Sequence, residues 1–269
     1  MTVIGAVIVL SMVVMTLLSR WISPYDPNKI LVGPIAPLSG SSPSWQFPFG
    51  TNDMGQDMLS RVLCGGSIMF QVAVLSVFFC FIIGVPIGLF ASYIGGALDK
   101  VCSLVMDSIY AFPALVLAIA IATMFERGVV NMALSIAVVY VPSYFRIVRS
   151  QVLTIKELPY VEAAKSTGAR GSTIVFRYIF PNLISSIVVV ATVNFADAIL
   201  TAAGLTFVGL GVPIDIPDWG RDLTNGRDLL PSGAWWVITF PGIMIILLAL
   251  GFTLMGEGLS EMLNPKLEQ

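Results

Sequence analysis

The chain has 269 residues, of which 57% are hydrophobic and only 11% charged, and it carries a formal net charge of −2 with no histidine. Soluble domains carry roughly 25% charged residues, so this composition excludes a soluble domain and indicates a helical protein that crosses a membrane several times. The charge balance argues against a nucleic-acid partner, and the lack of histidine excludes HExxH metalloproteases, His-dependent serine proteases and His-ligated haem. The sequence has no GxxxxGK[ST] loop, so we expect this chain not to bind ATP.

Six apolar segments are long enough to cross a bilayer as helices. Their approximate ranges are residues 2–18, 68–93, 101–124, 129–145, 183–207 and 235–255. The first has no basic flank and no A-x-A cleavage site, so we interpret it as an uncleaved anchor. Residues 1–67 are therefore expected to form this anchor and a long extracytoplasmic loop, and residues 68–269 a core of five crossings.

The second crossing contains residues that shape helices. Gly84 and Gly88 form a GxxxG pair, which predicts close contact with another helix. Pro86 predicts a kink, and Gly95-Gly96 predicts a turn after the crossing.

The basic residues indicate how the helices are oriented. Six of the 14 Lys and Arg lie in one charged block, residues 146–181, between the fourth and fifth crossings. The positive-inside rule places this block in the cytoplasm, and six crossings place both termini on the same side. Arg146 and Arg149 are interpreted as anchors to lipid headgroups. All five tryptophans fall on the outer side, three of them next to a helix end, where interfacial anchors lie.

Within this block the sequence predicts two short helices joined at a glycine. Pro159 suits the first turn of a helix, and Gly168 suits the left-handed residue that follows its end. A serine or threonine at positions 172–173 can cap a second helix, which Pro181 would end.

The first of these helices has a surface that another protein could approach. Ala163 and Ala164 leave a smooth face, and the charges of Glu162 and Lys165 can fix the register of a partner on it. The alternative is an amphipathic hairpin whose basic residues lie among lipid headgroups.

The string Glu162-Ala163-Ala164-x3-Gly168, with Pro181 at the family's proline position, resembles the EAA loop of binding-protein-dependent ABC importer permeases. Further landmarks resemble the dipeptide/oligopeptide/nickel subfamily and follow the same order along the chain. They are FGTNDMGQD (49–57), AFP (111–113), LTFVGLG (205–211), PDWG (217–220), GRD (226–228), FPG (240–242) and NP (264–265). Together these matches run from about residue 47 to 267.

The resemblance implies an all-α polytopic membrane protein of the type I ABC importer permease kind, with six transmembrane helices and cytoplasmic termini. Such proteins lie in the cytoplasmic (inner) membrane of prokaryotes. In this family the EAA loop is the coupling helix that docks into a cytoplasmic ATPase, which implies that role for the matching residues. These are Glu162, Ala163, Ala164, Gly168 and Pro181.

The resemblance also implies a set of partners. They are a second, homologous permease, two ATPase subunits that bind ATP and Mg²⁺, and an extracytoplasmic solute-binding protein that delivers cargo to the outer loops. The chain itself is expected to be a transporter subunit with no catalytic residue and no cofactor or metal of its own. Peptide is the expected cargo, with nickel and oligosaccharide as alternatives.

Two aspartates lie within predicted crossings. Asn194, Asp197 and Thr201 share one face of the fifth crossing, which either lines the pathway or makes a hydrogen-bonded helix contact. A charge at mid-membrane costs about 2.5–3.5 kcal/mol on insertion scales, so Asp197 should face a cavity or a partner. Asp107 of the third crossing is expected to make a structural or gating hydrogen bond.

The same two aspartates leave two other classes of protein open. An intramembrane aspartyl protease could use paired carboxylates, but its GxGD signature is absent from the sequence. A secondary transporter could use the aspartates as proton relays, but the sequence shows no convincing internal repeat. Only the importer requires a partner ATPase, so ATP dependence separates the three classes.

Overall fold

The computed structural model describes residues 1–31, 40–213 and 215–263, which form helices joined by loops. The helices are α1 (Thr2–Ile22), α2 (Met58–Ile94), α3 (Gly96–Tyr110), α4 (Ala114–Ala122), α5 (Val129–Ile155), α6 (Pro159–Ser166), α7 (Gly171–Thr173), α8 (Phe180–Phe207), α9 (Trp219–Leu229) and α10 (Trp236–Leu263). A π-helical segment, Ile174–Ile179, joins α7 to α8, and a 3₁₀ turn, Leu230–Ser232, follows α9. The landmark at 264–265 lies outside the described residues.

Among the described residues, 5 helices are long and apolar enough to cross a membrane, and the bent pair α3–α4 brings the number to 6. The sequence predicted six crossings, which agrees with this number if α3 and α4 together form one span. The third was predicted as one helix, but α3 and α4 meet at an angle of 92°. Pro113 accounts for the break, because proline has no backbone N–H to donate and disfavours a helical conformation at the residue before it.

Two crossings are longer than the sequence predicted. α2 begins at Met58 rather than near residue 68, because the carboxylate of Asp57 caps it by accepting from the Ser60 N–H at 2.8 Å. α5 continues beyond residue 145 to Ile155, so the start of the charged block is helical. The 37 residues of α2 span about 55 Å, well beyond a hydrocarbon core of about 30 Å. These helices therefore extend into water.

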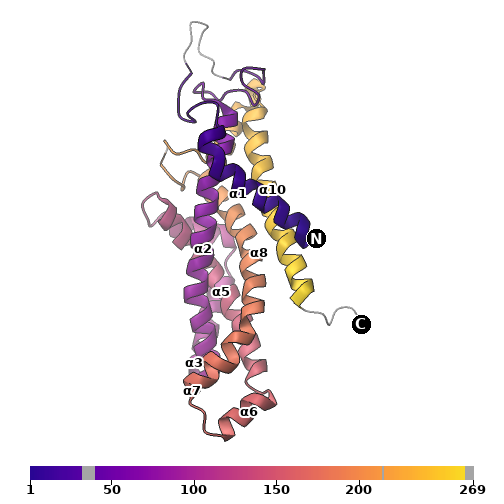
Figure 1. Ribbon diagram of the computed structural model, residues 1–269. Helices are drawn as coiled ribbons and strands as arrows, with labels where there is room; N and C mark the ends of the chain where they lie inside the picture. The colour runs from indigo at the N-terminus through magenta and orange to yellow at the C-terminus, as the bar shows by residue number, and fades with distance from the viewer. Residues whose placement is uncertain (32–39, 214, 264–269) are drawn as a thin grey trace.

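The long helices form an elongated bundle, with α6 at one end and the start of α2 at the other (Figure 1). α1 crosses α10 obliquely, and Gly5 and Gly258 allow the two helices to approach closely. A Cβ on Gly258 would overlap the backbone of Thr2, so the start of α1 lies against the end of α10. The start of α1 and the end of α10 therefore lie on the same side of the bundle, in agreement with the prediction.

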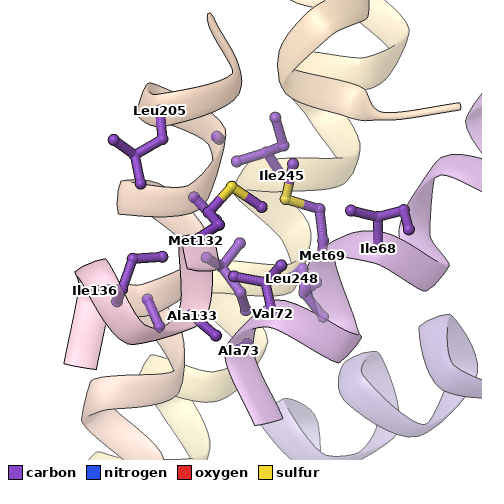
Figure 2. Packing of buried hydrophobic residues seen from close by; sticks show 14 of the residues in the cluster. Ile68, Met69, Val72, Ala73, Met132, Ala133, Ile136, Leu205, Ile245 and Leu248 are labelled. Atoms are coloured by element: carbon purple, nitrogen blue, oxygen red, sulfur yellow. The ribbon is translucent and has the colours of Figure 1, made fainter. Parts of the chain in front are cut away.

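The main core lies where α2, α5, α8 and α10 meet. Figure 2 shows its buried aliphatic and methionine side chains interlocking between these helices. Its labelled members are Ile68, Met69, Val72, Ala73, Met132, Ala133, Ile136, Leu205, Ile245 and Leu248. A second buried cluster, centred on Tyr144 and Phe145, continues the core toward α6. This continuity fixes α6 to the membrane helices.

The GxxxG pair makes the predicted close helix contact. A Cβ on Gly84 would lie 2.7 Å from the Cβ of Tyr144 and 2.9 Å from the carbonyl oxygen of Val141. A Cβ on Gly88 would lie 3.0 Å from the carbonyl oxygen of Phe145. α2 and α5 therefore approach each other to a distance that only glycine permits at these positions.

We expect Gly84→Ala to lower the free energy of unfolding by about 1–3 kcal/mol, because the added methyl group must push α2 away from α5. Gly128→Ala is the matched control, since a Cβ there meets no atom within 4 Å. Thermal unfolding of both variants in the same detergent measures the difference. Equal midpoints for the two variants would contradict the close contact.

The tryptophans correct one sequence prediction. Trp21 and Trp235 are exposed beside helix ends, where interfacial anchors were expected. Trp236 is only 6% exposed and donates from Nε1 to the carbonyl oxygen of Thr51 at 3.0 Å. Trp219 is fully buried and donates to the carbonyl oxygen of Val62 at 2.8 Å. These two are packing residues, because each indole N–H finds its partner inside the protein.

Candidate functional site

The first candidate site is the end of the bundle that carries α6. Pro159 lies in the first turn of α6, and Gly168 follows its end with φ +78°, as predicted. The N–H of Gly168 donates to the carbonyl oxygen of Lys165, and that of Ala169 to the carbonyl oxygen of Ala164, each at 3.0 Å. These two bonds form a Schellman motif, which requires the left-handed glycine.

The second predicted helix of the charged block starts and ends differently. It begins at Gly171 with Arg170 in the capping position, so the prediction of a cap at 172–173 is wrong. Pro181 does not end it either, because the chain is helical from Gly171 to Phe207. Pro181 lies in the first turn of α8, directly after the π-helical segment. Proline has no backbone N–H to donate. It is tolerated at this position because the change from π-helix to α-helix alters the local hydrogen-bond pattern.

α6 has one buried and one exposed face. Val161 and Ala164 are buried against this chain's own core, while Glu162, Ala163 and Lys165 are exposed. The smooth face predicted from both alanines is therefore reduced to Ala163. Ala164 instead permits α6 to lie close to its own bundle, because a small side chain keeps the two backbones near each other.

Hydrogen bonds to two neighbouring elements hold α6 in place, and an aromatic contact holds the π-helical segment that follows it. Nζ of Lys165 donates to the carbonyl oxygen of Lys156 at 3.3 Å, which ties α6 to the end of α5. Asn182 at the start of α8 donates to the hydroxyl of Tyr160 at 3.4 Å. Phe90 of α2 packs edge-on against Phe176 of the π-helical segment. α6 is therefore joined directly to the end of α5 and the start of α8.

Two ion pairs connect α3 with α5 near the same end of the bundle. Arg149 holds Asp99 in a bidentate arrangement, with both N–O distances 2.7 Å. Arg146 holds Asp107 at 2.7 Å and lies over the ring of Tyr110 at 3.9 Å. The two arginines were interpreted as lipid anchors, and this is wrong. Opposite charges in adjacent crossings were the available signal, because charges within membranes pair.

The pathway candidates are only partly brought together. A cavity of about 350 Å³ between α3, α5 and α8 is lined by Asn194 and Asp197, together with Arg146. Thr201 is buried away from this cavity, and its hydroxyl lies 2.8 Å from that of Tyr140. Asp107 is not among the residues that line this cavity, although it is paired with Arg146, which is. Thr201 therefore makes the helix contact that was the alternative prediction, while the half-buried Asp197 and the buried Asn194 line the cavity.

The second candidate site lies at the opposite end, where residues 47–66 and 215–238 pack together; we call this unit the outer cap. At its centre the Arg61 guanidinium and the Asp222 carboxylate are 2.8 Å apart, with side chains 3% and 0% exposed. Nη1 of Arg61 also donates to Oε1 of Gln56 at 2.9 Å. The indole of Trp219 packs against Gly65 and Gly66, where any Cβ would collide with its ring. The outer landmarks of the sequence are thus one packed unit.

Burial raises the pKa of Asp222 to about 6, although the neighbouring Arg61 acts in the opposite direction. An acid with a higher pKa in the folded than in the unfolded state binds protons more readily when folded, so a lower pH stabilises the fold. We expect the stability of the native chain relative to Asp222→Asn to increase as the pH falls from about 6 to about 4. Unfolding experiments across this range measure the difference in the free energy of unfolding between the native chain and Asp222→Asn. A difference that stays constant or decreases as the pH falls would contradict the raised pKa.

The five long apolar helices and the bent pair α3–α4 define a polytopic helical membrane protein, with a cavity between its helices and a short helix at one end. A family model described as "Binding-protein-dependent transport system inner membrane component" matches residues 84–269. The chain belongs to this family, the permease subunits of bacterial ABC importers.

Several curated relatives match almost the whole chain. The dipeptide transport system permease protein DppC of Alkalihalophilus pseudofirmus is 36% identical, covering 100% of this chain and 86% of the relative. The di/tripeptide transport system permease protein DppC of Pseudomonas aeruginosa is 36% identical over 98% of this chain and 88% of its own length. The glutathione transport system permease protein GsiD of Pectobacterium atrosepticum is 35% identical, with coverages of 99% and 87%.

The fold agrees with a solved ABC importer. A chain of the MetNI methionine ABC transporter, in an inward-facing conformation, superimposes with a TM-score of 0.61 and 18% identity. The match covers 77% of this chain and 97% of that one. At this identity the similarity shows the fold alone, and it confirms the predicted ABC importer permease architecture.

Family membership also establishes the role of the chain within its class. It is a non-catalytic, multi-pass inner-membrane subunit of an ABC importer, and ATP is bound by partner ATPases. The aspartyl protease alternative is therefore wrong. In the structure, Asp107 is paired with Arg146 rather than with a second carboxylate.

Proposed function

We propose that this chain is one of two permease subunits that form the pathway of an ATP-driven peptide importer, and that α6 couples the pathway to a cytoplasmic ATPase. The observation that carries the coupling role is the two-sided placement of α6. Its exposed residues Glu162, Ala163 and Lys165 face outward at the end of the bundle, while its buried residues lie on the membrane helices.

This arrangement would allow a movement of α6 to be passed on to the membrane helices. An ATPase that pulls on the exposed face of α6 would move a rigid unit, because the Schellman motif at Gly168 and the packing of Val161 and Ala164 resist local bending. The displacement would reach α5 and α8, which line the cavity containing Asp197. Opening and closing of that cavity would thereby follow the state of the ATPases.

Short peptides are the cargo class best supported. The three relatives above are named for dipeptides, di- and tripeptides, and glutathione, which is itself a tripeptide. Their similarity extends over nearly the full chain, including the helices around the cavity. Nickel and oligosaccharide remain the alternative cargoes, and the experiment described next distinguishes them from peptide.

Purification of this chain from native membranes in a mild detergent, followed by mass spectrometry, tests the assembly. We expect a second, related permease and two ATPase subunits. Reconstitution of that complex into liposomes with its solute-binding protein then tests the cargo, with radiolabelled alanyl-alanine, Ni²⁺ and an oligosaccharide as competing probes. ATP-dependent uptake of the dipeptide supports the proposal, whereas uptake of only one of the other two probes overturns the peptide assignment.

A further inference from the structure

We propose that the cavity between α3, α5 and α8 recognises both ends of a short peptide, with Asp197 binding the ammonium group and Arg146 the terminal carboxylate. This inference rests on the proposed peptide import and adds a specific recognition site within the permease. Four observations support it. The carboxylate of Asp197 has no cationic partner, and the guanidinium of Arg146 has one nitrogen without a hydrogen bond in the described part of the chain. The cavity has a suitable volume, and the rest of its described wall is uncharged.

Asp197 is a half-buried acid in a membrane crossing. Among the residues that the structure describes, its carboxylate makes no ion pair and accepts no hydrogen bond. Ionisable groups within membranes are costly and normally pair, so this carboxylate lacks the cation that would offset its desolvation. It faces the cavity, so a cationic group entering that space can supply the missing partner.

Arg146 presents the opposite charge to the same cavity. Its Nε and Nη2 donate to one oxygen of Asp107, at 3.2 and 2.7 Å, and its guanidinium lies over the ring of Tyr110. Within the described part of the chain, Nη1 has no hydrogen-bond partner. The planar guanidinium of arginine suits a carboxylate. Here Asp107 and Tyr110 fix its orientation, while Nη1 remains available to a ligand.

The two charges line one cavity but form no ion pair with each other. The cavity volume is about 350 Å³, within the range of roughly 300–1,000 Å³ typical of small-molecule sites. Two extended residues span at most about 7 Å, so a dipeptide is small enough to reach two charged side chains that line one cavity of this volume. A single ion could not satisfy both side chains, whereas a zwitterion with separated charges can.

The remainder of the wall favours recognition of the ends over recognition of side chains. The polar lining consists of Tyr110, Ser143, Asn194 and the two charged residues, and the rest is isoleucine and valine. Among the described lining residues, Arg146 and Asp197 carry the only charges. A site of this kind binds the features that all short peptides share and leaves their side chains against apolar surface.

The test measures equilibrium binding to the permease–ATPase complex in nanodiscs without the solute-binding protein, so that only the permease selects. The probes are alanyl-alanine, its N-acetyl derivative and its C-terminal amide. In the native complex, we expect blocking either end of the dipeptide to weaken binding about 10- to 100-fold, because each block removes a charge-assisted hydrogen bond. Asp197→Asn should abolish the penalty for acetylation and keep that for amidation, and Arg146→Gln should do the reverse.

Glu126→Gln and Arg127→Gln are the matched controls, since both residues are exposed on the turn between α4 and α5, and both penalties should persist in them. The inference is overturned if the native complex binds no dipeptide, or if Asp197→Asn keeps the full acetylation penalty. It is also overturned if Asp197→Asn instead separates the two permeases, because a cation of the second permease would then be the partner. Dipeptide uptake with the binding protein present is measured separately, and only its absence would contradict the proposed function.

Discussion

Replacing Gly168 with proline is expected to release the ATPase subunits from the complex while the two permease chains stay together. Gly168 has φ +78°, and its N–H donates to the carbonyl oxygen of Lys165. Proline fixes φ near −65° and has no N–H, so it cannot adopt this conformation or make this bond. The Schellman motif would be lost, and the exposed face of α6 would no longer have the orientation that an ATPase cleft requires.

The measurement is the stoichiometry of ATPase and permease chains after purification in a mild detergent. Gly168→Asn should retain the ATPases, because asparagine tolerates the left-handed conformation better than other residues with a side chain. Gly233→Pro is the matched control: Gly233 has φ +87° and donates to the carbonyl oxygen of Leu230, but it lies in the outer cap. Full retention of both ATPases by Gly168→Pro would show that α6 is not their docking element.

At a pH well above 6, where Asp222 is ionised, Asp222→Ala is expected to lower the free energy of unfolding by about 3–5 kcal/mol, because it leaves the charge of Arg61 buried without its carboxylate. Arg61 is only 3% exposed and lies in the centre of the outer cap, where water cannot replace the lost partner. For a chain of this length the change corresponds to a fall of unfolding temperature on the order of 10 °C. Thermal unfolding of the purified protein in detergent measures it.

Asp228→Ala is the control for this prediction. Arg227 and Asp228 also form an ion pair, at 2.9 Å, but their side chains are 55% and 64% exposed. Exposed pairs contribute little, so the unfolding temperature should remain close to that of the native chain. The double variant Arg61→Leu with Asp222→Leu should be more stable than Asp222→Ala, because neither residue then leaves a buried charge. Equal losses for Asp222→Ala and Asp228→Ala would mean that the buried pair has no special role.

If the outer cap is the surface that receives the solute-binding protein, the Arg61–Asp222 pair also explains why two distant outer segments present one surface. α2 and α9 meet through this pair and through the bond from Trp219 to Val62. Both contacts join residues about 160 positions apart in the sequence. Loss of the ion pair would thus disturb both α2 and α9.

Local features of the chain were sufficient to predict several parts of the structure. Uncharged apolar runs predict the crossings, because only a helix satisfies its backbone hydrogen bonds within a bilayer. The left-handed turn at Gly168 and the close approach at Gly84 follow from the lack of a Cβ in glycine, which is a property of the residue itself. The short helix α6, for which we propose the coupling role, was likewise predicted from a contiguous motif.

Tertiary structure alone decided the features that depend on a distant partner. The sequence shows Arg149 and Asp99 as ordinary charges near helix ends, and Trp236 as an interfacial anchor; the fold pairs the first two and buries the third. It also separates Thr201 from Asp197, although both lie on the predicted face, since Tyr140 of α5 takes the threonine hydroxyl. Helix periodicity determines which side chains share a face, but the neighbouring helix determines which of them remain open to a cavity.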